Sequence, residues 1–333
     1  MSHRISVQET GIAFVAEPGE PLLEAATRQG VRLPHECTFG GCGTCRVKLL
    51  QGDDEYEEMP LALSQEEADA GYALACQARA RSDLVISVQR AGDAPPAERR
   101  RAVVRGLRQW TPQVVNLELE VEADGLQFLP GQYMNVLLED GTHRSFSMAS
   151  APAGNRVDFH VRQIPGGRFT EAGLRRLATG DRLDVEIPLG AFRFHAEDYR
   201  PLVMVATGTG LAPIKSMLEA LMDDDDCPPV SLYWGMRGEA DLYLAQDIRG
   251  WGERLYDFRF VPVLSRPDAS WQGRRGHVQD AVAADFPDLS EHALYLCGSP
   301  AMIADAKRRF LDLGASADHV YVDGFTFQHP LAA

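Results

Sequence analysis

Four cysteines are spaced so that they could hold one metal centre together. Cys37, Cys42 and Cys45 form a C-x4-C-x2-C run, and Cys76 follows after a further thirty residues. Three glycines lie inside the run, and a loop that turns sharply and points its N–H groups at sulfur atoms needs the backbone freedom of glycine. Because thiolate sulfur binds both zinc and iron–sulfur clusters, the pattern predicts a metal site with these four cysteines as its ligands.

The choice between zinc, a cluster and scattered core cysteines rests on the spacing. Structural zinc sites usually take their ligands from two short C-x2-C pairs, whereas here three cysteines share one glycine-rich loop and the fourth stands alone. The spacing is that of plant-type [2Fe-2S] ferredoxins, and this part of the chain resembles them. The resemblance implies a [2Fe-2S] cluster held by Cys37, Cys42, Cys45 and Cys76.

A second candidate site is the run R-S-F-S from Arg144 to Ser147, which follows a P-G-Q-Y segment by about a dozen residues. The two segments resemble the flavin-binding half of the ferredoxin-NADP reductase family, whose R-x-Y-S motif holds FAD. The resemblance implies that Arg144 neutralises the FAD pyrophosphate, Phe146 lies against the isoalloxazine and Ser147 hydrogen-bonds near the flavin N5. Phe146 stands where the family usually has Tyr, so the aromatic face is kept and the phenol hydrogen bond is lost. The alternative is a β-strand with one outward-facing arginine.

The segment from His160 to Phe169 supports the flavin site. It ends a predicted strand, turns on two glycines and starts a helix, and free N–H groups at a helix N-terminus suit a phosphate. In the reductase family this turn meets the FAD pyrophosphate. The FAD contacts that the resemblance implies are Arg144, Ser145, Phe146, Ser147, His160, Val161, Arg162, Gly166, Gly167, Arg168 and Phe169.

A third site is predicted where an apolar strand runs into Thr207-Gly208-Thr209-Gly210. A strand followed by a glycine turn and a helix places a pyrophosphate at the helix N-terminus, and Pro213 suits the first helical turn. Because Pro213 occupies the third glycine position, the run is not the ordinary G-x-G-x-x-G fingerprint. It resembles the T-G-T-G-x-A-P motif of the same reductase family, which implies that NADH or NADPH binds here.

Two further motifs lie toward the C-terminus. Cys297 and Gly298 begin a C-G-S-P run that resembles the family's C-G-x-P, in which the cysteine lies beside the nicotinamide. A lone cysteine at a strand end is more often a small core residue. Phe325 ends a D-G-F run that resembles the D-x-F ending whose ring covers the flavin until the nicotinamide displaces it, with Phe327 as an alternative. Ser147, Cys297 and Phe325 are therefore the residues expected at the reacting rings.

The kind of nicotinamide depends on a further set of residues. Arg237, Ser265 and Arg266 complete the predicted nucleotide contacts. Arg266, with Arg274 and Arg275 nearby, could bind a 2′-phosphate through bidentate contacts. Similar serine-led strands occur in NADH-using relatives, and the sequence slightly favours NADH.

The elements that position these residues form three groups, so the fold class is multidomain. Residues 1–90 are predicted to form a ubiquitin-like α+β ferredoxin domain, with strands at 4–7, 12–16, 46–50, 72–76 and 84–88, a helix at 21–29 and a capping-box helix that starts at Ser64. A polar, proline-bearing linker follows at 91–101. Alternating runs at 103–107, 114–121, 133–138, 145–148, 157–161 and 183–187 predict an antiparallel β-barrel FAD domain over 102–197. Beyond it, apolar strands at 202–206, 230–234, 258–263 and 293–297 alternate with helices such as 212–222 and 300–313, which predicts a doubly wound α/β NAD(P) domain over 198–333.

Composition and charge indicate the class of protein, its cellular compartment and the partners that are excluded. The 333 residues are 45% hydrophobic and 24% charged, which is typical of a globular chain with two or three domains. No apolar run approaches the ~20 residues of a membrane span and the N-terminus lacks a signal-peptide core, so we expect a cytoplasmic protein with no membrane partner. The net charge of −15 argues against nucleic acid. The acidic residues 53–58 are expected to form a solvated loop or, alternatively, a surface that steers a basic partner.

The three sites explain one another. A nicotinamide gives up two electrons as a hydride, a [2Fe-2S] cluster takes one at a time, and a flavin converts between the two. The order of the segments resembles the reductase components of bacterial aromatic-ring-hydroxylating dioxygenases, of the benzoate and terephthalate type, which implies electron transfer to a Rieske-type oxygenase component. Reductases of diiron monooxygenases and of deoxysugar dehydrases remain alternatives, as does an iron–sulfur redox sensor. We expect a monomer because no extended apolar or heptad surface is apparent.

Overall fold

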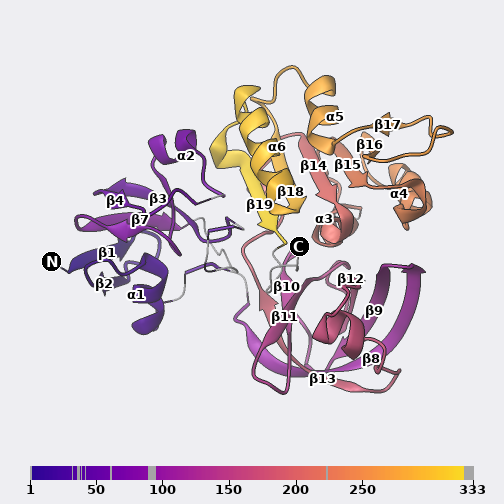
Figure 1. The fold of residues 1–333 in the computed structure, drawn as a ribbon, viewed down its shortest axis with the longest axis horizontal. Coiled ribbons are helices and arrows are strands. Elements are labelled where there is room, and N and C mark those ends of the chain that lie inside the picture. The colour runs from indigo at the N-terminus through magenta and orange to yellow at the C-terminus, as the bar shows by residue number, and fades with distance from the viewer. Residues whose placement is uncertain are drawn as a thin grey trace. The chain divides into compact units, whose positions relative to one another are not determined.

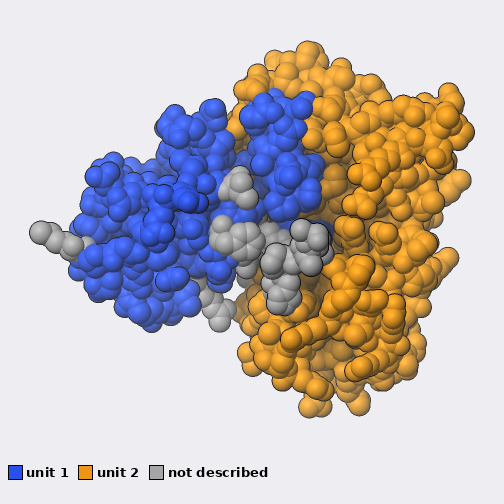
Figure 2. All heavy atoms as spheres, viewed as in Figure 1, with its two compact units in different colours: residues 1–93, 299–309, 322–333 blue, residues 94–298, 310–321 orange. Residues whose placement is uncertain are grey.

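The computed structural model describes residues 2–31, 33–35, 38, 40–41, 43–60, 62–88, 95–222 and 224–325. The chain divides into two compact units, which Figure 2 draws in blue and orange. The first unit consists of residues 1–93, 299–309 and 322–333, and the second of residues 94–298 and 310–321. Cys37, Cys42 and Phe327, which carry sequence-based predictions, lie outside the described residues.

The first unit contains a five-stranded sheet with the order β2-β1-β7-β3-β5 (Figure 1). Its strands are β1 (His3–Val7), β2 (Ala13–Ala16), β3 (Arg46–Gln51), β5 (Tyr72–Leu74) and β7 (Leu84–Val88). β1 and β7 pair in parallel, and the other neighbours are antiparallel. A separate small pair joins β4 (Asp54–Glu55) to β6 (Arg79–Ala80). This mixed sheet with its short helices confirms the predicted ubiquitin-like α+β fold.

The two short helices of this unit begin where the sequence predicts. α1 (Leu22–Arg28) starts after Pro21 and buries its apolar residues, Leu22, Leu23, Ala25 and Ala26. α2 (Gln65–Asp69) has Ser64 as its N-cap. The Glu67 N–H donates to Ser64 Oγ at 3.2 Å and the Ser64 N–H donates to Glu67 Oε2 at 3.0 Å, which is the reciprocal pattern of a capping box.

The second unit begins with a six-stranded antiparallel sheet with the order β11-β10-β13-β8-β9-β12 (Figure 1). Its strands are β8 (Glu98–Thr111), β9 (Val114–Val121), β10 (Tyr133–Leu137), β11 (His143–Ser147), β12 (Arg156–Arg162) and β13 (Arg182–Leu189). An isolated bridge between Met148 and Phe159 joins the two outer strands, so the sheet closes into the predicted barrel. Inward-facing residues such as Val104, Leu117, Met134, Val136 and Phe159 form its core.

β8 is longer than the sequence predicts. It starts at Glu98, so residues 98–101, which the sequence assigns to the linker, pair with β13 as part of the strand; residues 91–94 of the linker lie outside the described residues. The register of β8 against β9 shifts between Val104 and Gly106 and again between Gln109 and Thr111. Such bulges bend a strand, and here they let one strand of 14 residues follow the curve of the barrel.

A further sheet has the order β17-β16-β15-β14-β18-β19. It belongs to the second unit except for residues 322–324 of its last strand, and residues 300–309 of the helix before that strand also belong to the first unit. Its strands are β14 (Leu202–Thr207), β15 (Val230–Met236), β16 (Phe258–Leu264), β17 (Arg274–Arg275), β18 (Ala293–Gly298) and β19 (Val320–Gly324). The helices between them are α3 (Leu211–Leu221), α4 (Ala245–Gly250), α5 (Val278–Asp285) and α6 (Pro300–Asp312). β14 pairs in parallel with both β15 and β18, which confirms the doubly wound class.

The strand order places a topological switch at β14. The chain proceeds from β14 to β15 and β16 on one side, and later returns to β18 on the other side. Ligands of open parallel sheets bind outside the carboxyl ends of the strands at such a point. The turn after β14 and the end of β18 are therefore where the fold itself places a nucleotide.

Candidate functional site

Two of the four predicted cluster ligands lie within the described residues, at the ends of adjacent strands. Cys45 directly precedes β3, Cys76 follows β5, and these strands pair antiparallel. The Ala75 N–H donates to the Cys45 carbonyl at 3.0 Å, so the two cysteine segments run side by side. Both cysteines are buried, with 1% and 3% of their surface exposed. Two neighbouring buried thiols fit half of a [2Fe-2S] ligand set, and the complete set remains a prediction.

Two of the three glycines of the cysteine loop have the backbone conformation that the sequence analysis expects. Gly40 and Gly43 have φ values of +75° and +80°, a region that side chains disfavour. A Cβ atom on Gly40 would lie 2.5 Å from Pro60 Cβ. The Ala62 N–H donates to the Gly40 carbonyl at 3.0 Å, so Gly40 lies close against Pro60 and Ala62 and leaves no room for a larger residue at position 40.

A buried group of charges lies beside this loop and has no motif in the sequence. Arg46, which follows Cys45, places Nη1 3.0 Å from Glu67 Oε1. Lys307 Nζ is 2.6 Å from the same oxygen and donates to the Ala62 carbonyl at 3.2 Å. All three side chains are 5% exposed or less. Burial lowers the pKa of Lys307 to about 8. Burial alone would raise the pKa of Glu67, but the two cations hold it below its ordinary value.

The predicted flavin residues lie on the hairpin of β10 and β11. Arg144 and Phe146 share one face of β11 because side chains alternate along a strand. The Phe146 ring lies 5.5 Å from the Phe169 ring, so the two predicted FAD segments meet. Ser145 Oγ donates to Asn135 Oδ1 at 2.8 Å, and Ser147 is buried. The structure thus brings these predicted residues together, whereas their contacts to FAD stay predictions.

The turn after β12 differs from the predicted one. The following helix is a π-type turn of six residues, Arg168–Gly173, with Gly167 as its N-cap. The Gly166 N–H donates to the Glu171 carboxylate at 2.7 Å and the Gly167 N–H to the Ile164 carbonyl at 2.9 Å. These two N–H groups, which the sequence predicts to be free for a phosphate, are therefore used within the turn. Arg168 forms an ion pair with Asp140 of the β10–β11 connection.

The three residues at the end of β12 differ in burial, since His160 and Val161 are buried and Arg162 is exposed. The side chains of His160 and Val161 are buried in the protein. The His160 ring packs 4.9 Å from Trp110 and 5.4 Å from Tyr243. Burial and the positive charge of Arg237 lower the pKa of Arg162, so two arginines from the barrel and the parallel sheet lie near each other.

The dinucleotide turn and the end of β18 meet at the topological switch. β14 ends at Thr207, the 3-10 turn Gly208–Gly210 follows, and α3 begins at Leu211 with Pro213 in its first turn. A Cβ atom on Gly210 would lie 2.4 Å from the Cys297 carbonyl oxygen and 3.0 Å from Gly298 N. A Cβ on Gly208 would meet no atom of the described residues within 4 Å. The turn thus packs against the C-G-S-P motif through Gly210 and leaves open space beside Gly208.

Cys297 and Phe325 occupy different surroundings. Cys297 is 0% exposed at the end of β18, so its side chain lies within the protein directly beside the dinucleotide turn. Phe325 belongs to the first compact unit and is the last described residue. Its predicted place over the flavin stays a prediction.

The residues predicted to select the nicotinamide lie at the carboxyl ends of β15 and β16. The Arg266 N–H donates to the Arg237 carbonyl at 2.9 Å, and the Ser265 N–H donates to the Met236 carbonyl at 3.0 Å. The side chains of Arg237, Ser265 and Arg266 are exposed. Arg274 and Arg275 are engaged elsewhere: Arg274 forms an ion pair with the buried Asp285, and Arg275 donates to the carbonyls of residues 268, 269 and 271.

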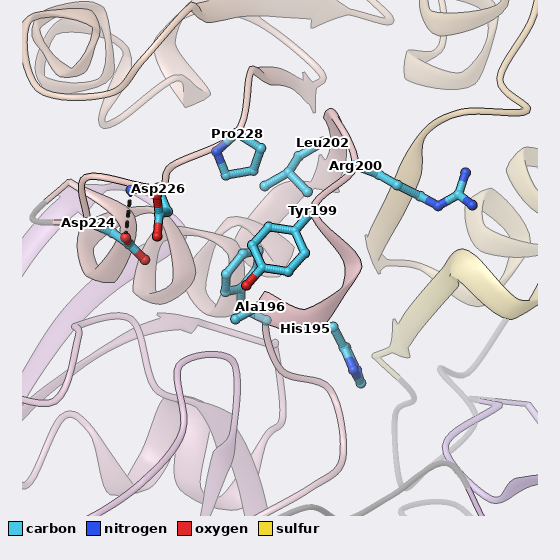
Figure 3. Close-up of a pocket in the computed structure, with 9 residues that line it drawn as sticks. His195, Ala196, Tyr199, Arg200, Leu202, Asp224, Asp226 and Pro228 are labelled. Atoms are coloured by element: carbon cyan, nitrogen blue, oxygen red, sulfur yellow. Dashed lines mark hydrogen bonds between the residues drawn. The ribbon is translucent and has the colours of Figure 1, made fainter.

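A small pocket of about 90 Å³ lies away from these motifs (Figure 3). It is lined by Phe194, His195, Ala196, Tyr199, Arg200, Leu202, Asp224, Asp226 and Pro228. Ligand sites for molecules of drug size are several times larger, about 300–1,000 Å³. The pocket is too small for a dinucleotide and contains no residue of the predicted sites.

No helix within the described ranges has the length and apolar character needed to cross a membrane.

Comparison with known families agrees with the three groups of motifs. Residues 5–81 match the 2Fe-2S iron-sulfur cluster binding domain, residues 109–194 the oxidoreductase FAD-binding domain and residues 204–308 the oxidoreductase NAD-binding domain. The matches together cover most of the chain and have the order that the sequence predicts.

Individual relatives are similar over nearly the full length. The chain is 34% identical to the reductase component 2 of terephthalate 1,2-dioxygenase from Comamonas sp, over 98% of each chain. It is 32% identical to the CDP-6-deoxy-L-threo-D-glycero-4-hexulose-3-dehydrase reductase of Yersinia pestis, over 98% of this chain and 99% of that protein. A solved structure of the Amycolatopsis cytochrome P450 reductase GcoB matches with a TM-score of 0.72 and 33% identity, over 97% and 98% of the two chains.

Proposed function

Because this chain belongs to the family of reductases that join a [2Fe-2S] ferredoxin domain to FAD- and NAD-binding domains, we propose that it supplies electrons to the oxygenase component of an aromatic-ring dioxygenase. As an oxidoreductase of this family, it carries electrons from NAD(P)H through FAD and the cluster to a protein partner. FAD supplies the conversion from hydride transfer to single-electron transfer. The protein's part is to bind these groups in order and to shield them from water and oxygen.

The proposal that NAD(P)H binds here and gives a hydride to FAD is supported by one backbone contact. The backbone of Gly210 packs on that of Cys297 and Gly298 at the switch of the parallel sheet, so the two nucleotide motifs form a single surface. The turn after β14 would hold the pyrophosphate of a nicotinamide dinucleotide, and Cys297 would lie at its nicotinamide end. Arg144, Phe146 and Ser147 on β11 are the proposed FAD contacts of the same unit.

The dioxygenase acceptor is supported by the full-length likeness to a reductase component of terephthalate 1,2-dioxygenase. A deoxysugar dehydrase and a diiron monooxygenase are the other candidate acceptors, since a dehydrase reductase is similar over the same length. The test is reconstitution with purified acceptors and NADH. We expect product formation with the Rieske-type oxygenase component of a terephthalate or benzoate dioxygenase. Turnover with a diiron hydroxylase or a dehydrase alone would overturn the acceptor assignment.

We propose NADH as the electron donor. Two of the three arginines considered for a 2′-phosphate, Arg274 and Arg275, have partners within the protein, which leaves Arg266 as the candidate for that contact. Reduction rates measured with NADH and NADPH at equal concentration test the proposal. A strong preference for NADPH would contradict it.

We also propose a cytoplasmic monomer that binds neither nucleic acid nor membrane. The net charge of −15 supports this, because it repels anionic surfaces. Sedimentation at low micromolar concentration measures the mass, and a stable dimer would contradict the monomer. A redox sensor is distinguished by its activity: such a protein would not reduce cytochrome c or dyes with NAD(P)H, whereas a reductase turns over.

A further inference from the structure

Four ring-bearing side chains connect the β-barrel to the parallel sheet within the second unit. Trp110 of β8 and His160 of β12 come from the barrel, whereas Trp234 of β15 and Tyr243, in the connection from β15 to α4, come from the part of the unit with the parallel sheet. Tyr243 stacks on Trp110, with ring centroids 5.1 Å apart and an interplanar angle of 22°. It also meets Trp234 edge-on at 5.0 Å and His160 edge-on at 5.4 Å. These four residues are called the aromatic bridge, and Tyr243 touches the other three.

Each end of the aromatic bridge is attached to a predicted cofactor segment. Trp234 Nε1–H donates to the Gly208 carbonyl at 2.9 Å, so the indole holds the first glycine of the dinucleotide turn. At the other end, His160 lies two residues before Arg162 on β12, the strand that leads into the predicted FAD turn. Because Tyr243 lies between these ends, a change in its side chain is expected to shift the turn relative to β12.

The Tyr243 hydroxyl adds a directional contact to the stacked rings. It lies 3.2 Å from His160 Nδ1. The His160 side chain is 0% exposed, and burial with the charge of Lys215 holds its pKa well below the ordinary value, so the imidazole is neutral. Nε2 lies 4.0 Å from an Asp158 carboxylate oxygen. That distance is too long for a hydrogen bond, so the imidazole tautomer decides which of Nδ1 and the Tyr243 hydroxyl donates in the bond between them.

A second set of contacts joins the same two parts of the unit without the aromatic bridge. Lys215 Nζ on α3 donates to the Ala149 carbonyl at 2.7 Å, and Ser216 Oγ donates to the Ser150 carbonyl at 2.7 Å. The Ala151 N–H donates to Glu219 of the same helix at 3.1 Å. α3 starts at the dinucleotide turn, and residues 149–151 follow the flavin motif. Loss of Tyr243 is therefore expected to leave the barrel and the sheet attached.

We propose that Tyr243 is a positioning residue that sets the alignment between the nicotinamide and the flavin by fixing the dinucleotide turn against β12. Stacking on Trp110 defines the separation of the two parts, and the hydroxyl bond to His160 defines the rotation of the tyrosine. This inference rests on the proposed function, because alignment matters only where a hydride passes between the two rings. Near-attack geometry controls such a step more strongly than it controls binding.

The test compares three variants of the full-length holoprotein. Tyr243→Leu removes the ring, and Tyr243→Phe removes only the hydroxyl. Tyr233→Phe is the matched control, since it removes a hydrogen bond of 2.7 Å from Tyr233 of β15 to Asp285 of α5. Tyr233 precedes Trp234, so its side chain lies on the opposite face of the strand from the aromatic bridge. For each variant, anaerobic stopped-flow gives the limiting rate of flavin reduction by NADH, the dissociation constant of NADH and the amplitude of the long-wavelength nicotinamide–flavin charge-transfer absorbance. Thermal unfolding gives the melting temperature.

The positioning role has a defined signature. Tyr243→Leu is expected to lower the limiting rate about tenfold or more and to halve the charge-transfer amplitude, with the NADH dissociation constant changed less than about threefold. Tyr243→Phe is expected to give a smaller loss of both, and Tyr233→Phe none. An unchanged rate and charge-transfer amplitude in Tyr243→Leu, or a loss confined to the dissociation constant or the melting temperature, would overturn the inference. The reductase function fails separately, if the wild-type flavin is not reduced by NADH at all.

Discussion

A Cβ atom on Gly210 would lie 2.4 Å from the carbonyl oxygen of Cys297. Real Cβ atoms do not approach a carbonyl this closely, so the dinucleotide turn keeps its place against β18 only because residue 210 lacks a side chain. Gly210→Ala is therefore expected to push the turn away from Cys297 and to weaken NADH binding about tenfold or more, since the backbone of this turn approaches the pyrophosphate. Titration of the oxidised protein with NAD⁺ measures the change.

The control for this variant is Gly250→Ala at the end of α4, where an added Cβ meets no described atom within 4 Å. The visible spectrum of both variants is expected to match the wild type. Unaltered nucleotide affinity in Gly210→Ala would show that the turn can move without consequence.

The cluster assignment is tested through its two described ligands. Cys45→Ser and Cys76→Ser are each expected to lose the iron and the cluster absorbance, because a hydroxyl is a poor replacement for a thiolate in a cluster held by four of them. Flavin reduction by NADH is expected to persist, since residues 144–147 of the FAD motif, the turn at 207–210 and Cys297 lie in the second unit. Iron analysis and the visible spectrum provide the measurement.

Cys227→Ser is the matched control for these variants, because Cys227 is likewise buried but lies in the second unit. It is expected to retain all of its iron. Retention of a complete cluster in Cys76→Ser would contradict the ligand set.

The buried charges beside the cluster loop are expected to be sensitive to single changes. Glu67→Gln leaves the Arg46 and Lys307 cations buried without a carboxylate, which is expected to lower the free energy of unfolding by about 3–5 kcal/mol. Lys307→Met keeps the pair of Arg46 and Glu67, so a smaller loss is expected. Urea unfolding followed by the cluster absorbance measures both.

Glu66→Gln is the control for this pair, since Glu66 is the exposed neighbour of Glu67 on α2. It is expected to change stability by less than about 0.5 kcal/mol. An equally small effect of Glu67→Gln would mean that water screens the three charges.

The buried His160 predicts a loss of stability in acid. Burial holds its pKa well below 6.5 in the folded protein, whereas the unfolded chain binds a proton near pH 6.5. The unfolded state therefore carries more protons below that pH, and the free energy of unfolding falls as the pH drops, by up to about 1.4 kcal/mol per pH unit for this residue. Unfolding experiments between pH 7 and 5 measure the slope.

His160→Gln is expected to show a shallower slope over this range, whereas His143→Gln, at an exposed position of β11, keeps the slope of the wild type. Equal slopes for all three proteins would indicate that His160 is protonated in the folded state.

Strand positions follow from the sequence wherever side chains alternate or stay apolar. The strand at 84–88 is found as predicted, and β14 and β18 differ from prediction by one residue each. β8 differs most from prediction, because Arg99 to Arg101 and Arg108 belong to the strand but do not alternate with apolar residues. Two bulges also interrupt its side-chain alternation. A periodicity argument finds the buried part of a strand and not its exposed ends.

The parts of the site that the sequence could not provide are contacts between distant segments. Lys307 and Glu67 are 240 residues apart, and no local pattern indicates that one neutralises the other. Trp110 and Tyr243 carry no motif either, since each is an ordinary aromatic residue until the fold stacks them. The motifs, by contrast, depend on local backbone geometry at the glycines, and that geometry is encoded within a few residues.

The central claim is that one chain takes electrons in pairs from NADH and releases them singly through its cluster. Anaerobic titration of the purified holoprotein with NADH tests this most directly. We expect flavin absorbance near 450 nm and the cluster shoulders to bleach together, with about three electrons taken up per chain, two by FAD and one by the [2Fe-2S] cluster. Uptake of only two electrons with an unchanged cluster spectrum, or a colourless protein, would contradict the account.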